Sequence, residues 1–472
     1  MIERLFRSQA SSLEIIYNAM PGPVRSAMAT IRGMGLPRNR QRWKTRRFVS
    51  ELRSHENWTR EEIAQFQSTQ LGVIINYARL SCPFYADYPQ FRSSNPESIR
   101  SYPVLKREVV RANAEDMISS AIARHDLIRV GTTGTTGAAL GVAYDDETAR
   151  RVWAMFLRQW IWAGLRTNEP RVTFFGSRVV PSARRRPPYW VHNLCERQML
   201  ASSFHLSART APDYLKFLAR HRGQVLEAFP SVLGILADFV LEQGITIPMK
   251  TVFTSGEPLY PFLREKAEKA FSTRVFDTYG MTELCGIIQE CEHGRMHLAP
   301  ESAYLEILDD DNEPVRPGED GYLTWTGFLN FAMPLIRYRI GDRGNWDLRD
   351  ACPCGRNFPM VVPTITRDSD LLHCPDGRIF SPRTLNQTLK QAFSFRFCQF
   401  VHDGHDRLLV RAVSSSPQAA KSDLDQVCAN VRRLLGPGMD VAGSLEIEPI
   451  MRAGGKMPLI VRQPATSSME RV

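Results

Sequence analysis

The chain has 472 residues, 43% of them hydrophobic, which is typical of a globular protein with room for two or three domains. Its 60 lysine and arginine residues exceed its 50 aspartate and glutamate residues, so the formal net charge is +10. No stretch reaches the roughly 18 uncharged apolar residues of a membrane span. The charged start MIERLFR argues against a secretory signal, and no run resembles a nucleic-acid-binding motif. We therefore expect a cytoplasmic protein that does not bind nucleic acid.

The first predicted segment, residues 1–60, has helical patterns with breaks at Pro21–Pro23 and Gly33–Pro37. Residues 37–47 carry six basic residues and no acidic one, and Arg184–Arg186 form a second basic cluster. Such clusters can attract phosphates, coenzyme A or lipid headgroups, so peripheral contact with a membrane is one interpretation. The other interpretation is a basic helix face exposed to solvent.

The second predicted segment, residues 61–364, begins with helical patterns and then alternates helices with short apolar strands, which indicates an α/β sheet. From residue 296 the pattern is β-rich. The expected elements are strands at 126–130, 140–145, 171–176, 249–256, 303–308, 322–327 and 334–340, and a helix near 212–221.

The third predicted segment, residues 365–472, reads as a small α+β domain behind the polar hinge TRDSD (366–370). The expected elements are a helix from Ser381, a hairpin over 397–413, a helix through 416–435 and a strand at 445–450. The fold class is therefore α/β: a large N-terminal domain with α/β sheets and a β-rich subdomain, plus a small mobile α+β C-terminal domain.

Five short runs carry candidate chemistry, one of which is TSGEPL (254–259). The first is the loop GTTGTTG (131–137), which has no Walker signature because Ala138 follows Gly137. Its backbone N–H groups and hydroxyls can bind phosphate oxygens, and the alternative is an ordinary glycine-rich hairpin. The candidate residues are Thr132, Thr133, Gly134, Thr135, Thr136 and Gly137.

The run YGMTE offers Tyr279 for stacking on a purine and Glu283 for Mg²⁺. RYRIGD places Arg337, Arg339 and Asp342 on a predicted turn, where a carboxylate can accept from ribose hydroxyls. GGK ends on Lys456, which can reach a phosphate–carboxylate junction. Each run alone also fits a structural role: a strand end, a turn with paired charges, or an exposed loop.

Taken in order, these runs resemble the adenylate-forming (ANL) superfamily, and especially phenylacetate–coenzyme A ligases of the subgroup associated with capsular polysaccharide biosynthesis. The residues that carry the resemblance span about 130–456. They are TTGTTG (132–137), TSGEPL (254–259), TYGMTELCG (278–286), ECEHGRMH (290–297), AMPLIRYRIGD (332–342), CPCGR (352–356) and GGK (454–456).

The resemblance implies ATP-dependent activation of a carboxylate as acyl-AMP, followed by transfer, with coenzyme A as the default acceptor. It implies an adenine pocket formed by Ser255, Gly256, Glu257, Tyr279 and Gly280. Asp342 would bind ribose with Arg367 close by, Thr282 and Glu283 would face phosphate and Mg²⁺, and Lys456 would be the adenylation lysine.

Two departures from the family pattern affect this interpretation. Ala138 and Ala139 stand where the family loop has Lys-Pro, and Thr366 replaces the hinge glycine. Transfer to an amine or hydroxyl of a sugar is therefore kept as an alternative, and so is a nucleotide-binding scaffold without turnover.

The cysteines and histidines suggest a separate structural zinc site. Cys291, His297, Cys352 and Cys354 provide three thiolates and an imidazole, a set that suits tetrahedral Zn²⁺. His293 is an alternative ligand, and reduced thiols without metal are the alternative interpretation. Candidates for the acyl pocket, which fit a hydrophobic core equally well, are Trp160, Phe204-His205 and Phe229-Pro230-Ser231.

Overall fold

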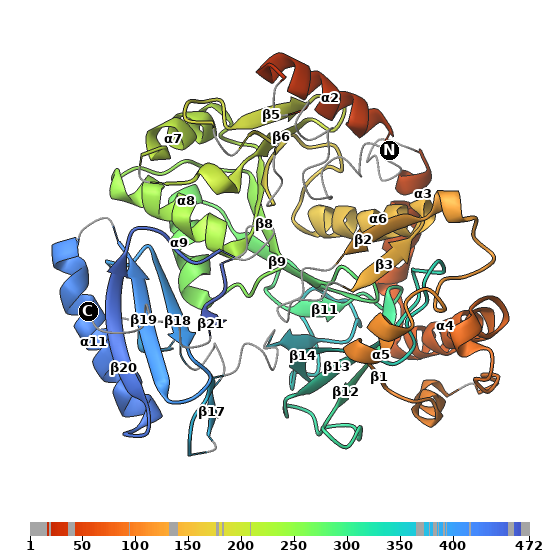
Figure 1. The fold of residues 1–472 in the computed structure, drawn as a ribbon. Coiled ribbons are helices and arrows are strands. Elements are labelled where there is room, and N and C mark those ends of the chain that lie inside the picture. The colour runs from red at the N-terminus through yellow and green to blue at the C-terminus, as the bar shows by residue number, and fades with distance from the viewer. Residues whose placement is uncertain are drawn as a thin grey trace. The chain divides into compact units, whose positions relative to one another are not determined.

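The computed structural model separates into two compact units, each built from several stretches of the chain (Figure 1). Unit 1 comprises residues 1–171, 191–199 and 276–365, and unit 2 comprises residues 172–190, 200–275 and 366–472. The structure describes residues 17, 20–35, 43–93, 95–131, 140–175, 179–181, 184–207, 209–364, 372–376, 378–380, 385, 387–389, 392, 394–414, 417–451 and 457–463. The three segments predicted from the sequence stay a prediction.

Unit 1 begins with helices whose ends follow local sequence signals. Thr59 caps α4: its hydroxyl accepts from the Glu62 backbone N–H, and Glu62 accepts from the Thr59 N–H in return. Asp145 caps α6 by accepting from the Thr148 N–H at 2.8 Å. The helices are α2 (Gly22–Gly35), α3 (Trp43–Ser54), α4 (Arg60–Ser81), α5 (Arg107–Ala112) and α6 (Asp146–Trp162), with short 3₁₀ turns at His55–Asn57, Pro83–Tyr85, Pro96–Ser101 and Arg124–Asp126.

The strands of unit 1 form a hairpin, an antiparallel ribbon and a five-stranded sheet. β2 (Ile128–Gly131) and β3 (Gly141–Tyr144) form the predicted hairpin on either side of the glycine-rich loop. In the ribbon, β10 pairs with both β9 and β11, and in the sheet the order is β1-β14-β13-β12, with β15 on β14. The bounds are β1 (Leu105–Lys106), β9 (Val275–Gly280), β10 (Ile287–Glu290), β11 (Met296–Leu298), β12 (Ala303–Leu308), β13 (Gly321–Gly327), β14 (Tyr338–Trp346) and β15 (Val361–Pro363).

One prediction in this sheet is wrong. The RYRIGD run does not form a turn, because β14 continues through it from Tyr338 to Trp346. The strand also begins later than the predicted 334–340. Gly341 has φ +98°, and the pairing with β13 shifts between Tyr322 and Thr324. A glycine kink beside such a bulge re-aims the side chains of a strand without ending it.

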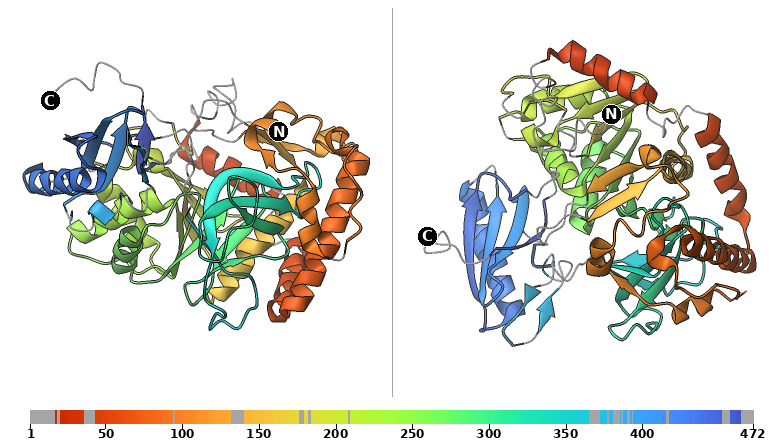
Figure 2. Two further views of the ribbon diagram at one scale, coloured as in Figure 1. Left: turned by 90° about the horizontal axis from the view of Figure 1, so that it is seen from below. Right: turned by 45° about the vertical axis from the view of Figure 1, so that its right-hand side comes forward.

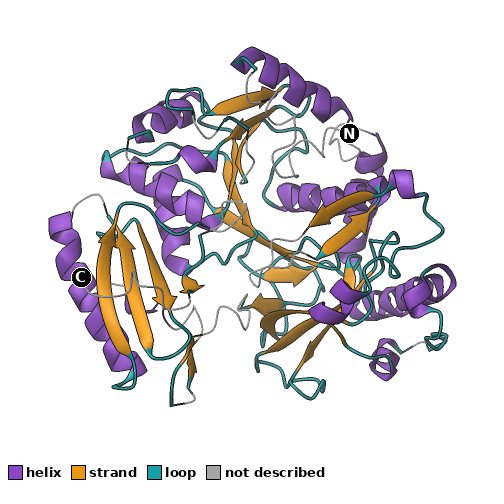
Figure 3. Cartoon of the chain, in the orientation of Figure 1, coloured by secondary structure: helices purple, strands orange, loops and turns teal. Residues whose placement is uncertain are grey.

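Unit 2 contains two groups of elements. In the first, β7 and β8 run parallel, and α8 packs side by side with α9 (Figure 3). The bounds are α7 (Ala211–Arg220), β7 (Val225–Ala228), α8 (Pro230–Glu242), β8 (Thr251–Ser255) and α9 (Pro261–Phe271). The chain passes between the two units within β4 (Arg171–Phe174), β5 (Trp190–Asn193) and β6 (Gln198–Ala201), and a 3₁₀ turn follows at Ser203–His205.

The second group is a four-stranded sheet of order β20-β19-β18-β21, with α11 along one face (Figure 2). The hairpin predicted over 397–413 is confirmed as β18 and β19, and the following helix as α11. The strand predicted at 445–450 is displaced, because β20 runs from Asp440 to Glu446. The predicted helix start at Ser381 lies outside the described residues. The bounds are β16 (Leu372–His373), β17 (Ile379–Phe380), a 3₁₀ turn at Gln387–Leu389, β18 (Phe397–His402), β19 (Arg407–Val413), α11 (Pro417–Leu435), β20 (Asp440–Glu446) and β21 (Ile460–Arg462).

Candidate functional site

Unit 1 brings together Tyr279 from the YGMTE run and Asp342 from the RYRIGD run. The Tyr279 hydroxyl donates to Asp342 Oδ2 at 2.8 Å, and both side chains are buried. The Tyr279 ring also stacks on Trp325, with ring centroids 5.9 Å apart. Gly286 makes room for that indole, because a Cβ at Gly286 would lie 2.1 Å from Trp325 Cε3. One face of the Tyr279 ring is therefore packed against protein.

Glu283 lies in the turn between β9 and β10 and is almost fully buried. Its Oε1 accepts from Arg107 Nη1 at 3.0 Å and from the Tyr338 hydroxyl at 3.2 Å. The adjacent Thr282 is exposed. Arg107 was missed in the sequence because no motif includes it, whereas Tyr338 belongs to the RYRIGD run.

α6 supports the strand end that carries Tyr279. The Gln159 side chain on α6 donates to the backbone carbonyls of Asp277 and Glu290 at 2.8 and 3.2 Å. It also accepts from the Thr278 hydroxyl at 2.6 Å. Because these atoms are buried and hydrogen-bonded, they fix the position of the strand end relative to the helix.

Of the other predicted adenine-pocket residues, Gly280 ends β9 in unit 1 and three lie in unit 2. Ser255 ends β8, and Gly256 has φ +81°, a value that favours glycine. The Glu257 carboxylate accepts from the Ser231 N–H and from the Met457 N–H, each at 3.0 Å. It therefore joins the start of α8 to the residue that directly follows Lys456. The TSGEPL run, the start of α8 and the residue after the GGK run thus meet at the Glu257 carboxylate.

The remaining predicted ligand residues have no described position. They are the loop residues Thr132, Thr133, Gly134, Thr135, Thr136 and Gly137, together with Arg367 and Lys456.

The two arginines of the RYRIGD run have structural partners. Arg337 forms a two-point ion pair with Glu306, at 2.9 and 2.8 Å, and is almost fully buried. Arg339 donates to the Asp309 carbonyl at 2.8 Å and lies over the Tyr322 ring. Arg337, directly before β14, is therefore paired with an acidic residue, whereas Arg339, within β14, has a carbonyl and an aromatic ring as partners.

The four predicted zinc ligands converge in unit 1. Their ligand atoms all lie within 4.8 Å of one another, and the residues are Cys291, His297, Cys352 and Cys354. The Cys291 and Cys352 sulfurs are 3.6 Å apart, and Cys354 Sγ is 3.5 Å from His297 Nε2. Tetrahedral Zn–S bonds place two sulfurs about 3.7 Å apart. The spacing therefore fits zinc.

The surroundings of the cluster select His297 over His293. His297 Nδ1 lies 3.1 Å from the Phe358 carbonyl, which leaves Nε2 directed at the sulfurs. His293 instead donates its backbone N–H to Cys291 Sγ at 3.3 Å. A hydrogen bond from Cys291 lowers the pKa of Cys354 to about 2, so the cluster already stabilises one thiolate.

The acyl-pocket candidates divide into core residues and residues with existing partners. Trp160 is buried. Both ring nitrogens of His205 are engaged, Nδ1 with the Ser202 hydroxyl at 2.8 Å and Nε2 with the Pro181 carbonyl at 3.1 Å. Phe229 meets Phe175 edge to face. None of these contacts identifies an acyl group.

Comparisons with known proteins show what the chain as a whole is similar to. Residues 132–332 match the family of AMP-binding enzymes. Protein CapK from Staphylococcus aureus is 22% identical over 417 residues, covering 86% of this chain and 89% of its own. A phenylacetate-coenzyme A ligase from Thermus thermophilus is 23% identical over 332 residues, covering 67% of this chain and 73% of its own.

Among solved structures, 2-hydroxyisobutyryl-CoA ligase in the postadenylation state matches with a TM-score of 0.68 and 19% identity, covering 87% of this chain and 91% of that one. This likeness concerns the fold. Residues 132–332 are therefore similar to the AMP-binding enzymes, and the chain has the fold of this CoA ligase.

Proposed function

We propose that this adenylate-forming ligase activates a carboxylate with ATP as acyl-AMP and then transfers the acyl group to coenzyme A. The observation that carries the proposal is the hydrogen bond between Tyr279, inside the AMP-binding match, and Asp342, beyond its end at residue 332. Two runs assigned to one nucleoside from the sequence are thus in contact in the fold.

We assign the following roles to residues of the chain. Asp342 accepts from ribose hydroxyls while Tyr279 holds the carboxylate in place. Gly256 and Gly280 allow the adenine to approach the backbone closely. Lys456 stabilises the charge on the phosphate as the substrate carboxylate attacks, and Thr282 and the 132–137 loop donate to phosphate oxygens.

Mg²⁺ fits the site with one condition. Glu283 Oε1 already accepts from Arg107 and Tyr338, so a Mg²⁺ ion held by this carboxylate would have to share it with Arg107 or displace that guanidinium. When bound, the ion neutralises phosphate charge. Zn²⁺ at the cysteine and histidine cluster would be structural, because all four positions of the tetrahedron are filled by protein.

Coenzyme A as acceptor is supported by the names of relatives, which include phenylacetate-coenzyme A ligases and a 2-hydroxyisobutyryl-CoA ligase. Transfer to an amine or hydroxyl of a sugar is a second candidate, favoured by the longer match to protein CapK and by the family resemblance in the sequence. A scaffold without turnover is a third candidate, to which Ala138 and Ala139 point.

Exchange of labelled pyrophosphate into ATP tests the proposal. A panel of aliphatic, aromatic and hydroxy acids is supplied one at a time, and each acid is then tested for thioester formation with coenzyme A. Acid-dependent exchange with thioester formation is the expected result. Exchange without thioester would favour a sugar acceptor, and nucleotide binding without exchange for any acid would favour the scaffold.

We also propose peripheral contact with an anionic membrane through α2. Its exposed apolar residues Val24, Ala27, Ile31 and Met34 recur at the spacing of one helix face. The opposite face is polar and docked: the Ser26 and Thr30 hydroxyls accept from the backbone N–H groups of residues 192 and 194. α2 thus turns its apolar side outward, as an interfacial helix does.

Exposed cations at the start of α3 complement this face, next to the exposed Trp43; they are Lys44, Arg46 and Arg47. No helix among the residues that the structure describes is long and apolar enough to cross a membrane. Sedimentation with phosphatidylserine vesicles, but not with pure phosphatidylcholine, is expected. Ile31→Glu should reduce it, while Leu348→Glu, at an exposed leucine elsewhere in unit 1, should not.

A further inference from the structure

A buried glutamine in unit 2 holds both ends of the 450–458 segment, which carries Lys456 in the sequence. Gln399 lies on β18. Its Oε1 accepts from the Ile450 N–H at 2.6 Å, and its Nε2 donates to the Ile450 carbonyl at 3.0 Å and to the Pro458 carbonyl at 2.9 Å. The donor and the acceptor of this amide are therefore both engaged with the backbone of the segment's ends.

Two further contacts fix the chain directly after Lys456. The Met457 N–H donates to the Glu257 carboxylate at 3.0 Å, and the Leu459 carbonyl accepts from the Phe400 N–H at 2.8 Å. The chain then continues as β21, which pairs parallel with β18. The C-terminal side of the segment is thus held by the sheet as well as by the glutamine.

The sequence between these ends makes the anchors important. Gly454 and Gly455 directly precede Lys456. Glycine has wide backbone freedom, so the position of a lysine that follows two glycines depends on how the chain is held at either end. A side chain that stabilises charge in a transition state acts from one position, and a misplacement of about 1 Å can slow a reaction by ~100-fold. A contact that restricts both ends of the segment therefore controls the step that the lysine serves.

We propose that Gln399 is a positioning residue for Lys456 in acyl-AMP formation, an inference that rests on the proposed function. Lys456 supplies the charge, and Gln399 acts through it and not on the reacting atoms. Breaking the contacts of the glutamine is costly, because a buried polar group left without a partner loses its desolvation free energy. The amide therefore keeps the two ends of the segment in place relative to each other and to β18.

Gln399→Met tests the proposal on the full chain, because methionine has a similar length but cannot form these hydrogen bonds. With the most active acid of the panel above, kcat for acyl-AMP formation should fall by about 10- to 100-fold, with little change in the KM for ATP. Transfer from a supplied acyl-AMP should be unchanged. Because Gln399 acts through Lys456, the double variant Gln399→Met/Lys456→Ala should be no slower than Lys456→Ala alone.

Limited trypsin digestion without substrate separates this inference from the proposed function. Cleavage after Arg452 or Lys456, located by mass spectrometry, should be faster in Gln399→Met than in the parent protein. Unchanged cleavage would overturn the proposal, because Gln399 would then not hold the segment. Faster cleavage in a protein whose parent shows no exchange with any acid would confirm the anchor but overturn the proposed function, and the role of Lys456 with it.

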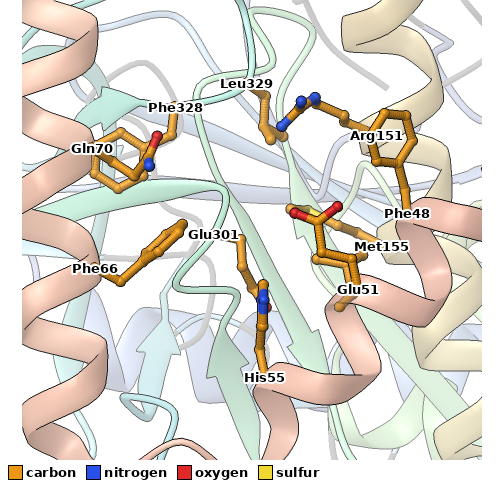
Figure 4. A pocket seen from close by; sticks show the side chains of 11 residues that line it. Phe48, Glu51, His55, Phe66, Gln70, Arg151, Met155, Glu301, Phe328 and Leu329 are labelled. Atoms are coloured by element: carbon orange, nitrogen blue, oxygen red, sulfur yellow. The ribbon is translucent and has the colours of Figure 1, made fainter.

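Two glutamines of α4 in unit 1 provide matched controls. Gln67 is buried and its Nε2 donates to the Ala303 carbonyl at 3.1 Å, so Gln67→Met loses a buried hydrogen bond elsewhere in the chain. Gln70 lines a pocket in unit 1 (Figure 4), and Gln70→Met makes the same change at a half-buried position. Neither control should separate acyl-AMP formation from transfer. Equal losses of both half-reactions in Gln399→Met would overturn the proposal, as would additive losses in the double variant.

Discussion

At the scale of single residues, the candidate site depends on carboxylates that are held before any ligand arrives. Asp342 is fixed by Tyr279, Glu283 by Arg107 and Tyr338, and Glu257 by two backbone N–H groups. Such groups need little reorganisation when a ligand binds, which is the condition under which a polar site is most effective. The holding partners are therefore as informative to mutate as the carboxylates.

The first prediction concerns Asp342. Asp342→Asn should weaken ATP binding by about 10- to 100-fold, because a hydrogen bond to a charged group contributes about 1.5–3 kcal/mol. It should also abolish the preference for ATP over 2′,3′-dideoxy-ATP in calorimetry, since that preference depends on the ribose hydroxyls. Tyr279→Phe keeps the carboxylate and should keep the preference. If Asp342→Asn still discriminates between the two nucleotides, Asp342 does not bind the ribose.

The second prediction concerns Lys456, whose next residue is anchored to Glu257. Lys456→Ala should slow acyl-AMP formation by about 10²–10³-fold, the usual effect of losing one preorganised donor. Transfer from a supplied acyl-AMP should be largely unchanged. Lys421→Ala on α11 removes an equal charge from an exposed position and serves as the control. Equal losses in both half-reactions would rule out a role confined to adenylation.

At the scale of elements, sequence signals that act over a few residues predicted helices and hairpins correctly. The hairpin β2–β3, the hairpin β18–β19 and helix α11 all lie where the sequence predicts them. The prediction missed the start of β20 because residues 440–444, apart from Val441, have low β-propensity and are held in the strand by parallel pairing with β19. Glycine is required at position 443 of β20, because a Cβ there would lie only 2.9 Å from the Cys428 sulfur of α11.

The third prediction concerns the end of α9. Ser272 is exposed, follows the last helical residue and has φ +48°, a left-handed conformation that costs a residue with a Cβ about 1–2 kcal/mol. Ser272→Gly should therefore raise the free energy of unfolding by about 1 kcal/mol in urea denaturation. Ser272→Ala also removes the hydroxyl but keeps the Cβ, and it should give no such gain. A gain in both variants would trace the effect to the hydroxyl.

At the scale of the whole molecule, each unit joins segments that are distant in the sequence. In unit 1 the cysteine and histidine cluster links the β10–β11 turn to residues 352–354, which precede β15. Ile63 of α4 and Trp162 of α6 pack into the same apolar cluster as Cys291, Cys352 and Phe358. A metal there would therefore stabilise several elements at once.

The fourth prediction concerns that metal. Purified protein should contain about one zinc ion per chain, and Cys291→Ser or Cys352→Ser should remove it and lower the melting temperature, because zinc binding contributes folding energy. Cys82→Ser alters a buried cysteine outside the cluster and should leave the zinc content unchanged. Metal analysis and thermal melting measure both effects. A stable, metal-free protein would mean that these residues are plain thiols.

The sequence by itself determined the order of the motifs, the alternation of helices and strands and the residue types of the cysteine and histidine cluster, because these depend on residue type and short-range spacing. Only the tertiary structure decided that His297 and not His293 meets the cysteines, that Arg107 holds Glu283, and that α2 turns its apolar face outward. Each of these three outcomes depends on a contact between segments that are close in space and distant in the sequence. Packing between elements selects such pairs, and no local periodicity encodes them.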